Sequence, residues 1–325
     1  MHQKVPLTAA LMIRRARTLL IGATLFWGLT FPLIRGLQLA QNDHAPDVSA
    51  PTLVSADVAA RFGVAALVLL PFCVRDLLNI RRREWMQAIG LAFLAGIGLF
   101  LQSLGLAWTD ASVAAFLTQL YTLIVPLIVA LRDWRLPGWR VFVACGLVLA
   151  GAALLSPDIL KHFVPGVGEL VILLSAVFFA GQIVWVERPI FAENRALLVT
   201  MLMFALLAAM FITGYVGQGG DIATLKRLFE PAPVWQMFLA LLFLCTIFTF
   251  LIMNCWQRWV SATEAGIIYC IEPVIAAILC GFLPGWISRF ASISYPNEPL
   301  TWTLFVGGSL IVGATILVAT EKRTA

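Results

Sequence analysis

The stretch QRWVSATEAGIIYCIEPVIAAILCG, residues 257–281, places an acidic side chain inside an apolar run. Glu272 is followed directly by Pro273, and its other neighbours are isoleucine, cysteine, tyrosine and valine. A carboxyl in such a run is costly within a membrane unless it has a partner, water or a functional role. At 1.5 Å per residue, a position about ten residues into a helical span lies about 15 Å deep, near the middle of a bilayer.

The rest of the chain has the same apolar character. It has 325 residues, of which 61% are hydrophobic and 12% charged, and its mean hydropathy is +0.94. Soluble domains carry about 25% charged residues. The composition therefore predicts an integral membrane protein whose surroundings are the lipid bilayer. The net charge of +5 is interpreted as a topology signal and not as a nucleic-acid-binding surface.

Ten runs are long enough to cross a bilayer, since a helical span needs about 20 apolar residues. The runs are continuously apolar and do not alternate, which favours helices over a β-barrel. We therefore expect an all-α membrane protein with ten transmembrane helices. The predicted spans are 18–40, 53–74, 85–108, 112–131, 139–155, 169–186, 196–215, 234–255, 262–283 and 300–319.

The distribution of lysine and arginine predicts the orientation. With ten spans, 16 of the 22 basic residues fall on the side of the N-terminus and four on the opposite side, while Arg35 and Arg61 lie within spans. Loops that remain in the cytoplasm carry the excess of positive charge. The chain is thus predicted to lie in a bacterial cytoplasmic (inner) membrane with both termini in the cytoplasm.

The two halves of the sequence resemble each other. The segment AWTDASVAAFLTQLYT (107–122) aligns with RWVSATEAGIIYCIEP (258–273), which pairs Tyr121 with Glu272. Each half contains five predicted spans, and an odd number means that the halves insert in opposite orientations. The prediction is two inverted five-helix repeats, residues 18–156 and 168–320. Such inverted repeats are typical of transporters, with the substrate site near the midplane between the halves.

Several of these segments carry a family resemblance. WGLTFPLIRG (27–36) is similar to the first-span pattern of the EamA family in the drug/metabolite transporter superfamily, and Ala262, Thr263, Glu272-Pro273-Val274, Glu298 and Gly307-Gly308 follow the pattern of its second half. The resemblance implies ten helices around a central cavity and proton-driven export of amino acids or related metabolites.

The chain departs from the family pattern at four places. Arg35 replaces a lysine, Tyr121-Thr122 stands where a Glu-Pro pair is expected, Asp133 is the best match to an acidic residue after the fourth span, and residues 284–296 are an insertion. These departures leave the expected fold unchanged but bear on the substrate and on the role of the insertion.

Glu272 is the first candidate for function. It would take up and release a proton or contact the substrate; the alternative is a structural carboxyl that forms hydrogen bonds near the bend at Pro273. Helical spacing places Tyr269 on the same stripe. The predicted cavity residues are Trp27, Phe31, Thr118, Tyr121, Gln182, Trp185, Tyr269 and Glu272, and ordinary packing between helices is the alternative for the others.

Two arginines within spans have structural interpretations. Asp57 precedes Arg61 by four residues, so a helical ion pair is expected. Arg35 lies near the outer end of its span and is expected to extend toward the membrane surface, with a role in gating as the alternative. Glycines in spans 5 and 10 permit close helix packing, and these spans are also a candidate homodimer face.

The leading prediction is a secondary transporter of a small-molecule substrate. An uncoupled facilitator is the near alternative, in which Glu272 would only line the cavity. An enzyme is disfavoured, because no metal-binding, nucleophile or phosphate-binding motif occurs in the sequence. A membrane scaffold or sensor is the third class. No catalytic residue, metal site or cofactor is predicted.

Overall fold

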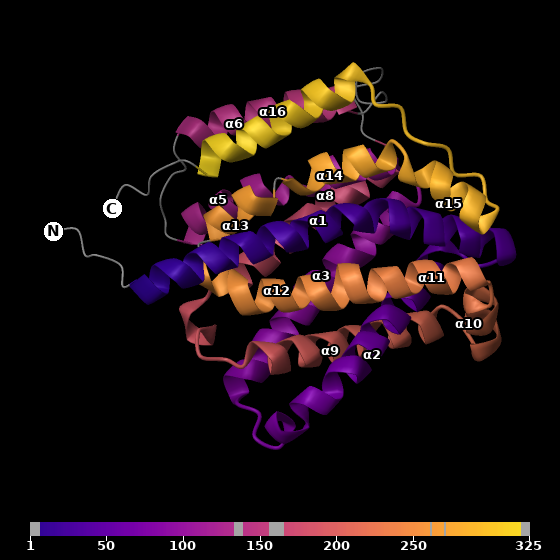
Figure 1. The fold of residues 1–325 in the computed structure, drawn as a ribbon, viewed down its shortest axis with the longest axis horizontal. Helices are drawn as coiled ribbons and strands as arrows, with labels where there is room; N and C mark the ends of the chain where they lie inside the picture. Colours follow the sequence, from indigo (N-terminus) through magenta and orange to yellow (C-terminus); the bar gives the residue numbers. More distant parts are fainter. Residues whose placement is uncertain (1–6, 133–138, 156–165, 261, 270, 320–325) are drawn as a thin grey trace.

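The computed structural model describes residues 7–132, 139–155, 166–260, 262–269 and 271–319 (Figure 1). Asp133 lies outside these ranges. Within them all regular structure is helical and no strand occurs. The helices lie alongside one another in a bundle, and α1 begins on the side where α16 ends (Figure 1). The prediction of an all-α protein is confirmed.

Seven helical segments are long and apolar enough to cross a membrane. They are α1 (Leu7–His44, of which Leu11–His44 qualifies), α2 (Ala50–Leu77), α3 (Arg82–Leu106), α4 with α5 (Ala111–Thr118 and Tyr121–Arg132), α8 (Val167–Val186), α9 (Ala196–Gly217), and a composite segment, Ala232–Trp259. The composite segment consists of α11 (Ala232–Ala240), the π-helix η2 (Leu241–Phe248), α12 (Thr249–Trp256) and the 3₁₀ turn η3 (Gln257–Trp259). The chain is therefore a multi-pass membrane protein.

The remaining apolar helices are shorter or bent. One pair, α14 with α15, has the length and composition of an eighth span but is bent by 51°. These helices are α6 (Trp139–Leu155), α13 (Ala262–Tyr269), α14 (Ile271–Cys280), α15 (Leu283–Ala291) and α16 (Trp302–Ala319).

Two predicted loops contain helices, which corrects the sequence interpretation. Within 216–233 lies α10 (Ile222–Phe229), where the Asp221 carboxylate accepts a hydrogen bond from the Thr224 N–H at 2.7 Å and caps the helix. Within 284–299 lies α15. Pro284 fits its first turn, and Ser292, with φ 55°, ends it in the left-handed conformation. Neither helix is long enough to be recognised from apolar length alone.

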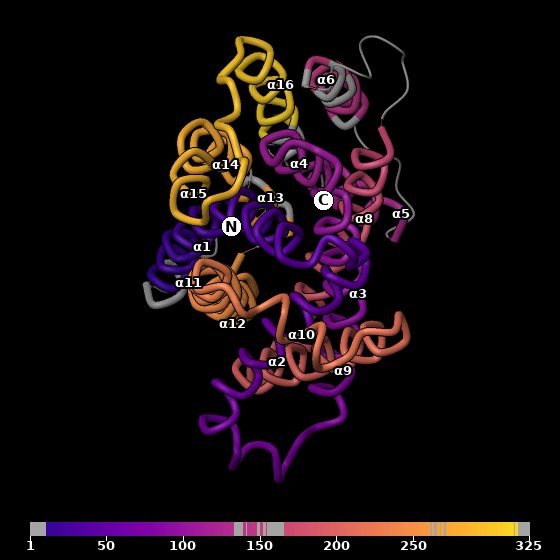
Figure 2. Tube along the Cα trace, turned by 90° about the vertical axis from the view of Figure 1, so that its right-hand side faces the viewer, coloured from indigo at the N-terminus to yellow at the C-terminus, as the bar shows by residue number. Residues whose placement is uncertain are grey.

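The packing of the helices places α1 at the centre. It contacts α12 and η2 on one side and α13 and α14 on the other (Figure 1). Three further pairs pack closely: α2 with α9, α3 with α8, and α6 with α16. The α6–α16 pair lies at one edge of the bundle, apart from α2 and α9 (Figure 2). A Cβ atom at Gly151 would lie 2.7 Å from the Gly307 carbonyl oxygen, so the absence of a side chain there permits this close approach.

One predicted span contains a turn. The helix α4 ends at Thr118 and α5 begins at Tyr121. In the sequence repeat Thr118 aligns with Tyr269, the last described residue of α13. Backbone that departs from a regular helix at membrane depth is tolerated where it is buried in protein or lines a cavity.

Candidate functional site

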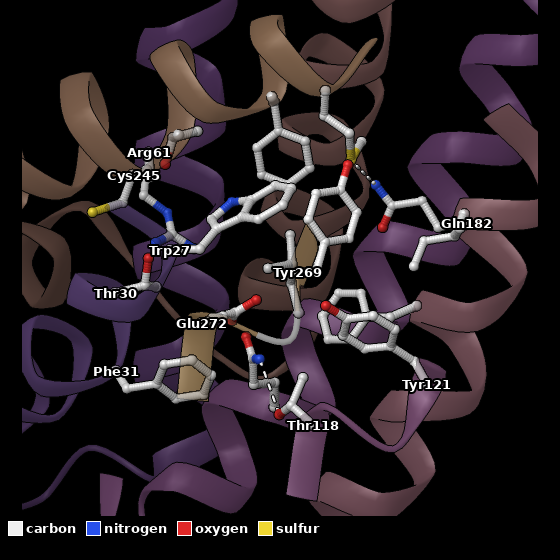
Figure 3. A pocket seen from close by; sticks show the side chains of 17 residues that line it. Trp27, Thr30, Phe31, Arg61, Thr118, Tyr121, Gln182, Cys245, Tyr269 and Glu272 are labelled. Atoms are coloured by element: carbon white, nitrogen blue, oxygen red, sulfur yellow. Dashed lines mark hydrogen bonds between the residues drawn. The ribbon is translucent and has the colours of Figure 1, made fainter. Parts of the chain in front are cut away.

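A cavity lies where α1 meets α4, α5, α13 and α14 (Figure 3). Its walls come from α1, α2, α3, α4, α5, α8, η2, α12, α13 and α14, so residues far apart in the sequence share it. The space open to the centre of a water-sized sphere is about 80 Å³. One water needs about 10–15 Å³ by that measure, so the cavity holds several waters or part of a small solute.

Seven of the eight predicted cavity residues line this one space. They are Trp27, Phe31, Thr118, Tyr121, Gln182, Tyr269 and Glu272. Helical spacing predicted that Tyr269 and Glu272 share one face, and both line this cavity. Thr118 and Tyr121, their equivalents in the repeat, lie across the same cavity (Figure 3).

Trp185 does not line the cavity, which corrects its prediction. Its indole N–H donates to the Gln87 carbonyl oxygen at 3.2 Å, and its ring lies 5.3 Å from that of Phe191. The guanidinium of Arg188 covers the ring at 4.6 Å. Trp185 follows Gln182 by three residues and points toward α3 and the short turn η1 (Pro189–Phe191) instead.

Glu272 is buried, with 7% of its surface exposed. Tyr121, its partner in the sequence repeat, lines the same cavity. No ion pair involves Glu272 among the described residues. The carboxyl is therefore not paired with a cation in the described part of the chain, and it lines a cavity that water or a solute can occupy.

Aromatic rings form the wall next to Glu272. The Trp27 ring lies 5.2 Å from that of Tyr269 and 6.2 Å from that of Phe250, both in edge-to-face arrangements. The Tyr269 hydroxyl donates to Gln257 Oε1 at 3.0 Å, and Gln257 Nε2 in turn donates to the Ile183 carbonyl oxygen at 3.3 Å. These bonds fix the ring of Tyr269, so the wall is preorganised for an apolar or aromatic group.

Amide side chains supply polar groups at other points of the cavity. Gln102 Nε2 donates to Thr118 Oγ1 at 3.2 Å and so joins α3 to α4. Gln182 Nε2 lies 3.8 Å from the sulfur of Met253, a weak acceptor. A weakly bonded amide is available to exchange that contact for a ligand.

The sequence interpretation missed several lining residues on η2 and the helix that follows it. Cys245, Thr246, Phe250 and Met253 line the cavity. Thr246 Oγ1 donates to the carbonyl oxygen of Leu241, five residues earlier, within the π-helix. Short π-helical segments often lie at functional sites. No feature of this apolar sequence marks where the wider helical turn occurs.

Arg61 was also missed as a cavity residue, and the predicted ion pair with Asp57 does not form within the described part of the chain. The Asp57 carboxylate accepts a hydrogen bond from Gln41 Nε2 at 2.7 Å instead. The two charges still attract each other at longer range. A charged residue within an apolar span is itself a sign of a functional cavity. The presence of Asp57 four residues earlier suggested a structural ion pair for Arg61 instead.

Polar contacts tie the helices together at the end of the bundle where α2 ends and α3 begins. Arg195, which precedes α9, holds the carboxylate of Glu84 through Nε at 2.8 Å and Nη2 at 2.7 Å, and it reaches Asp76 at 2.8 Å. The hydrogen bond to Glu84 is the main reason that the pKa of Arg195 is raised. This forked contact joins the second half of the chain to the first.

A second contact between the halves lies at the other end. The Glu298 carboxylate accepts hydrogen bonds from the N–H groups of Ala111 at 2.9 Å and Ser112 at 3.2 Å, at the start of α4. Burial raises the pKa of Glu298. Nearby, Arg35 Nη1 donates to the Ala107 carbonyl oxygen at 2.7 Å, so this arginine binds the end of α3.

The described residues contain no cluster of three or more histidine, cysteine, aspartate or glutamate side chains that could hold a metal ion. The site chemistry in these residues consists of a carboxyl, a guanidinium, hydroxyls, amides and aromatic faces. This set is suited to binding and proton exchange.

Comparisons with known proteins agree with this picture. Residues 15–156 match the EamA-like transporter family. A protein of Archaeoglobus fulgidus named as an uncharacterized transporter is 23% identical over 300 residues, covering 91% of this chain and 82% of the relative. A solved crystal structure resembles the fold with a TM-score of 0.53 and 19% sequence identity, covering 91% of this chain and 95% of that one.

Proposed function

We propose that this chain, whose residues 15–156 match the EamA-like transporter family, is a secondary transporter that exports small metabolites, such as amino acids or related compounds, across the cytoplasmic membrane. Transport is proton-coupled through Glu272. The site performs no covalent chemistry on its substrate. Both termini lie in the cytoplasm, in accordance with the distribution of basic residues.

The observation that carries this proposal is the position of Glu272. It is the one carboxyl among the described lining residues of the central cavity, and only 7% of it is exposed. When it is protonated, the cavity loses a negative charge; when it is ionised, the carboxylate attracts a cationic group of the substrate. A single site that alternates between proton and substrate couples their movement in opposite directions.

The arrangement of helices supports two inverted repeats, 18–156 and 168–320. Equivalent helices of the two halves pack against each other, α2 with α9 and α6 with α16. Thr118 and Tyr121 of the first half and their equivalents Tyr269 and Glu272 of the second half line the same cavity. In this proposal the ten spans form two five-helix units that rock about the cavity and open it to each side in turn.

The contacts at the two ends of the bundle are candidates for the gates of this cycle. Arg195 joins the halves at one end and Glu298 at the other. Opening the cavity requires one of these contacts to separate while the other holds. We further propose that α6 and α16 form a homodimer face, with Gly146 and Gly313, which meet no described atom within 4 Å, toward the second copy.

The test uses purified full-length protein in liposomes. Vesicles are loaded with the twenty proteinogenic amino acids, the outside is made more acidic than the inside, and the compounds released are measured by mass spectrometry. The proposal expects release of a subset, faster with the proton gradient than without it. Glu272→Gln is expected to remove that acceleration.

Each outcome separates the candidate functions. If the wild type and Glu272→Gln both release substrate at a rate that does not depend on the proton gradient, the protein is a facilitator and the coupling proposal is wrong. New products in the vesicles identify an enzyme. Neither release nor products, from protein that is folded by its unfolding curve, contradicts transport of these substrates.

A further inference from the structure

Arg61 brings to the central cavity a positive charge that has no hydrogen-bond or ion-pair partner among the described residues. Its side chain comes from the middle of α2, and only 5% of it is exposed. In the described structure it makes no hydrogen bond or ion pair, and its buried Nε has no partner. Figure 3 shows it on the cavity wall beside Trp27, Thr30 and Cys245.

A guanidinium in this position is costly to bury. Arginine keeps its proton in proteins, so it cannot avoid the cost by becoming neutral. A buried charge is normally paired or contacts water in a functional cavity. Asp57 offsets part of the cost at longer range, but its carboxylate is already hydrogen-bonded to Gln41. The forked donor of Arg61 is therefore left for a group that enters the cavity.

The positive and negative groups of the cavity do not neutralise each other. Arg61 and Glu272 line the same space, yet no ion pair joins them, and the carboxylate that attracts the guanidinium at longer range is that of Asp57. The aromatic wall of Trp27 is shared by both groups in Figure 3. The cavity thus offers an anion-binding pole, an apolar wall and an acidic pole.

We propose that Arg61 binds the carboxylate of the transported substrate through two parallel N–H···O hydrogen bonds. This inference rests on the proposed transport function and narrows its substrate class to small molecules with a carboxylate and an apolar part, whose ammonium group, where present, faces Glu272. A planar carboxylate matches the guanidinium fork, and the match gives geometric specificity.

Ligand-induced stabilisation of the purified protein tests this assignment without requiring transport. The unfolding temperature is measured with each of the twenty amino acids, and each compound that raises it is compared with its amide and with the amine that lacks the carboxyl. A ligand at free concentration L that binds only the folded state stabilises it by RT ln(1 + L/Kd), so at a fixed concentration a tighter ligand gives a larger shift. The carboxylates are expected to stabilise the protein, and the amides and amines are not.

Two variants and a control locate the effect. Arg61→Gln is expected to weaken binding by about 10- to 100-fold, the range for a lost hydrogen bond to a charged group. Arg61→Lys retains the charge without the fork and is expected to bind about tenfold more weakly than wild type. Arg35→Gln, which removes an arginine bonded to Ala107, should leave binding unchanged.

Three results would overturn the assignment. They are equal stabilisation by amides, unchanged carboxylate binding in Arg61→Gln, and no stabilisation of the wild type by any carboxylate. Liposome flux distinguishes this failure from that of the proposed function. If the protein transports the amines, it is a transporter that does not require a carboxylate, and only the Arg61 assignment is wrong. If carboxylates bind but no flux occurs, the Arg61 site stands and the transport proposal is wrong.

Discussion

Tyr121 and Glu272 line the same central cavity, although they are 151 residues apart in the sequence. They also occupy equivalent positions in the two halves of the sequence. The repeat therefore brings one carboxyl and one phenol to the cavity, and not two carboxyls. This asymmetry leaves Glu272 as the one carboxyl among the described lining residues.

Substitution at both positions tests this pairing. Tyr121→Phe keeps the ring but removes a hydroxyl from the cavity that Glu272 shares. The pH profile of proton-driven flux should therefore shift by a fraction of a pH unit, because the polarity around the carboxyl changes, while Glu272→Gln should show no pH dependence at all. Flux in liposomes between pH 5 and 9 measures both. An unchanged profile in the two variants would exclude Glu272 from coupling.

The aromatic wall gives a matched pair of substitutions. Trp27→Ala removes a ring that lies 5.2 Å from Tyr269 in the cavity, whereas Trp185→Ala removes a ring that packs outside it. Both changes should lower the unfolding temperature, because each leaves a void. Only Trp27→Ala should raise KM for the substrate, by about tenfold for a lost aromatic contact of about 1.4 kcal/mol. A similar KM change in both variants would contradict the assigned cavity.

The Arg195 contact predicts a stability effect. Arg195→Gln breaks hydrogen bonds to Glu84, whose side chain is fully buried, and leaves that carboxylate without its cation. The expected loss is about 2 kcal/mol in the free energy of unfolding. Denaturation of the purified variant in detergent measures it.

Arg227→Gln is the control for this prediction. The Arg227–Asp47 pair is just as short, at 2.6 Å, but its side chains are 46% and 67% exposed. Water already solvates both charges, so no measurable loss of stability is expected. An equal loss in the free energy of unfolding of Arg195→Gln and Arg227→Gln would show that burial does not determine how much these ion pairs contribute to stability.

Glu298 predicts a specific pH dependence of stability. Burial raises its pKa in the folded protein, so the folded state binds the proton more tightly than the unfolded chain. The stability of the wild type relative to Glu298→Gln should therefore fall as the pH increases above about 4.3, the ordinary value for glutamate, until the folded-state pKa is passed. Paired unfolding curves across this range measure the difference, and a constant difference would contradict the prediction.

The packing of α6 against α16 can be tested with two glycines on one helix. Gly151→Leu places side-chain atoms against the Gly307 carbonyl oxygen, 2.7 Å from the new Cβ, and should cost about 1–3 kcal/mol of stability. A Cβ atom added at Gly146 meets no described atom within 4 Å, so Gly146→Leu should leave the fold of the monomer intact. If Gly146 lies in a homodimer face, this second variant should reduce dimer formation, measured by crosslinking in membranes.

Much of the candidate site could be predicted from the sequence, because a charge in an apolar run and a repeated motif are local features. Glu272, Tyr121 and Trp27 were found in this way. Trp185 was predicted as a cavity residue but lies outside the cavity, since its indole bonds to the Gln87 carbonyl oxygen and its ring packs against Phe191.

The sequence by itself determined the membrane class and the helical architecture, because hydropathy and span length are properties of the chain alone. Tertiary structure decided which charges are paired. Arg61 and Asp57 are one helical turn apart, yet Gln41 from another helix occupies the carboxylate. The hydrogen-bond partner of a buried charge is chosen among all the helices that surround it, so neither the position of Asp57 nor that of Arg61 could show that the guanidinium faces the cavity.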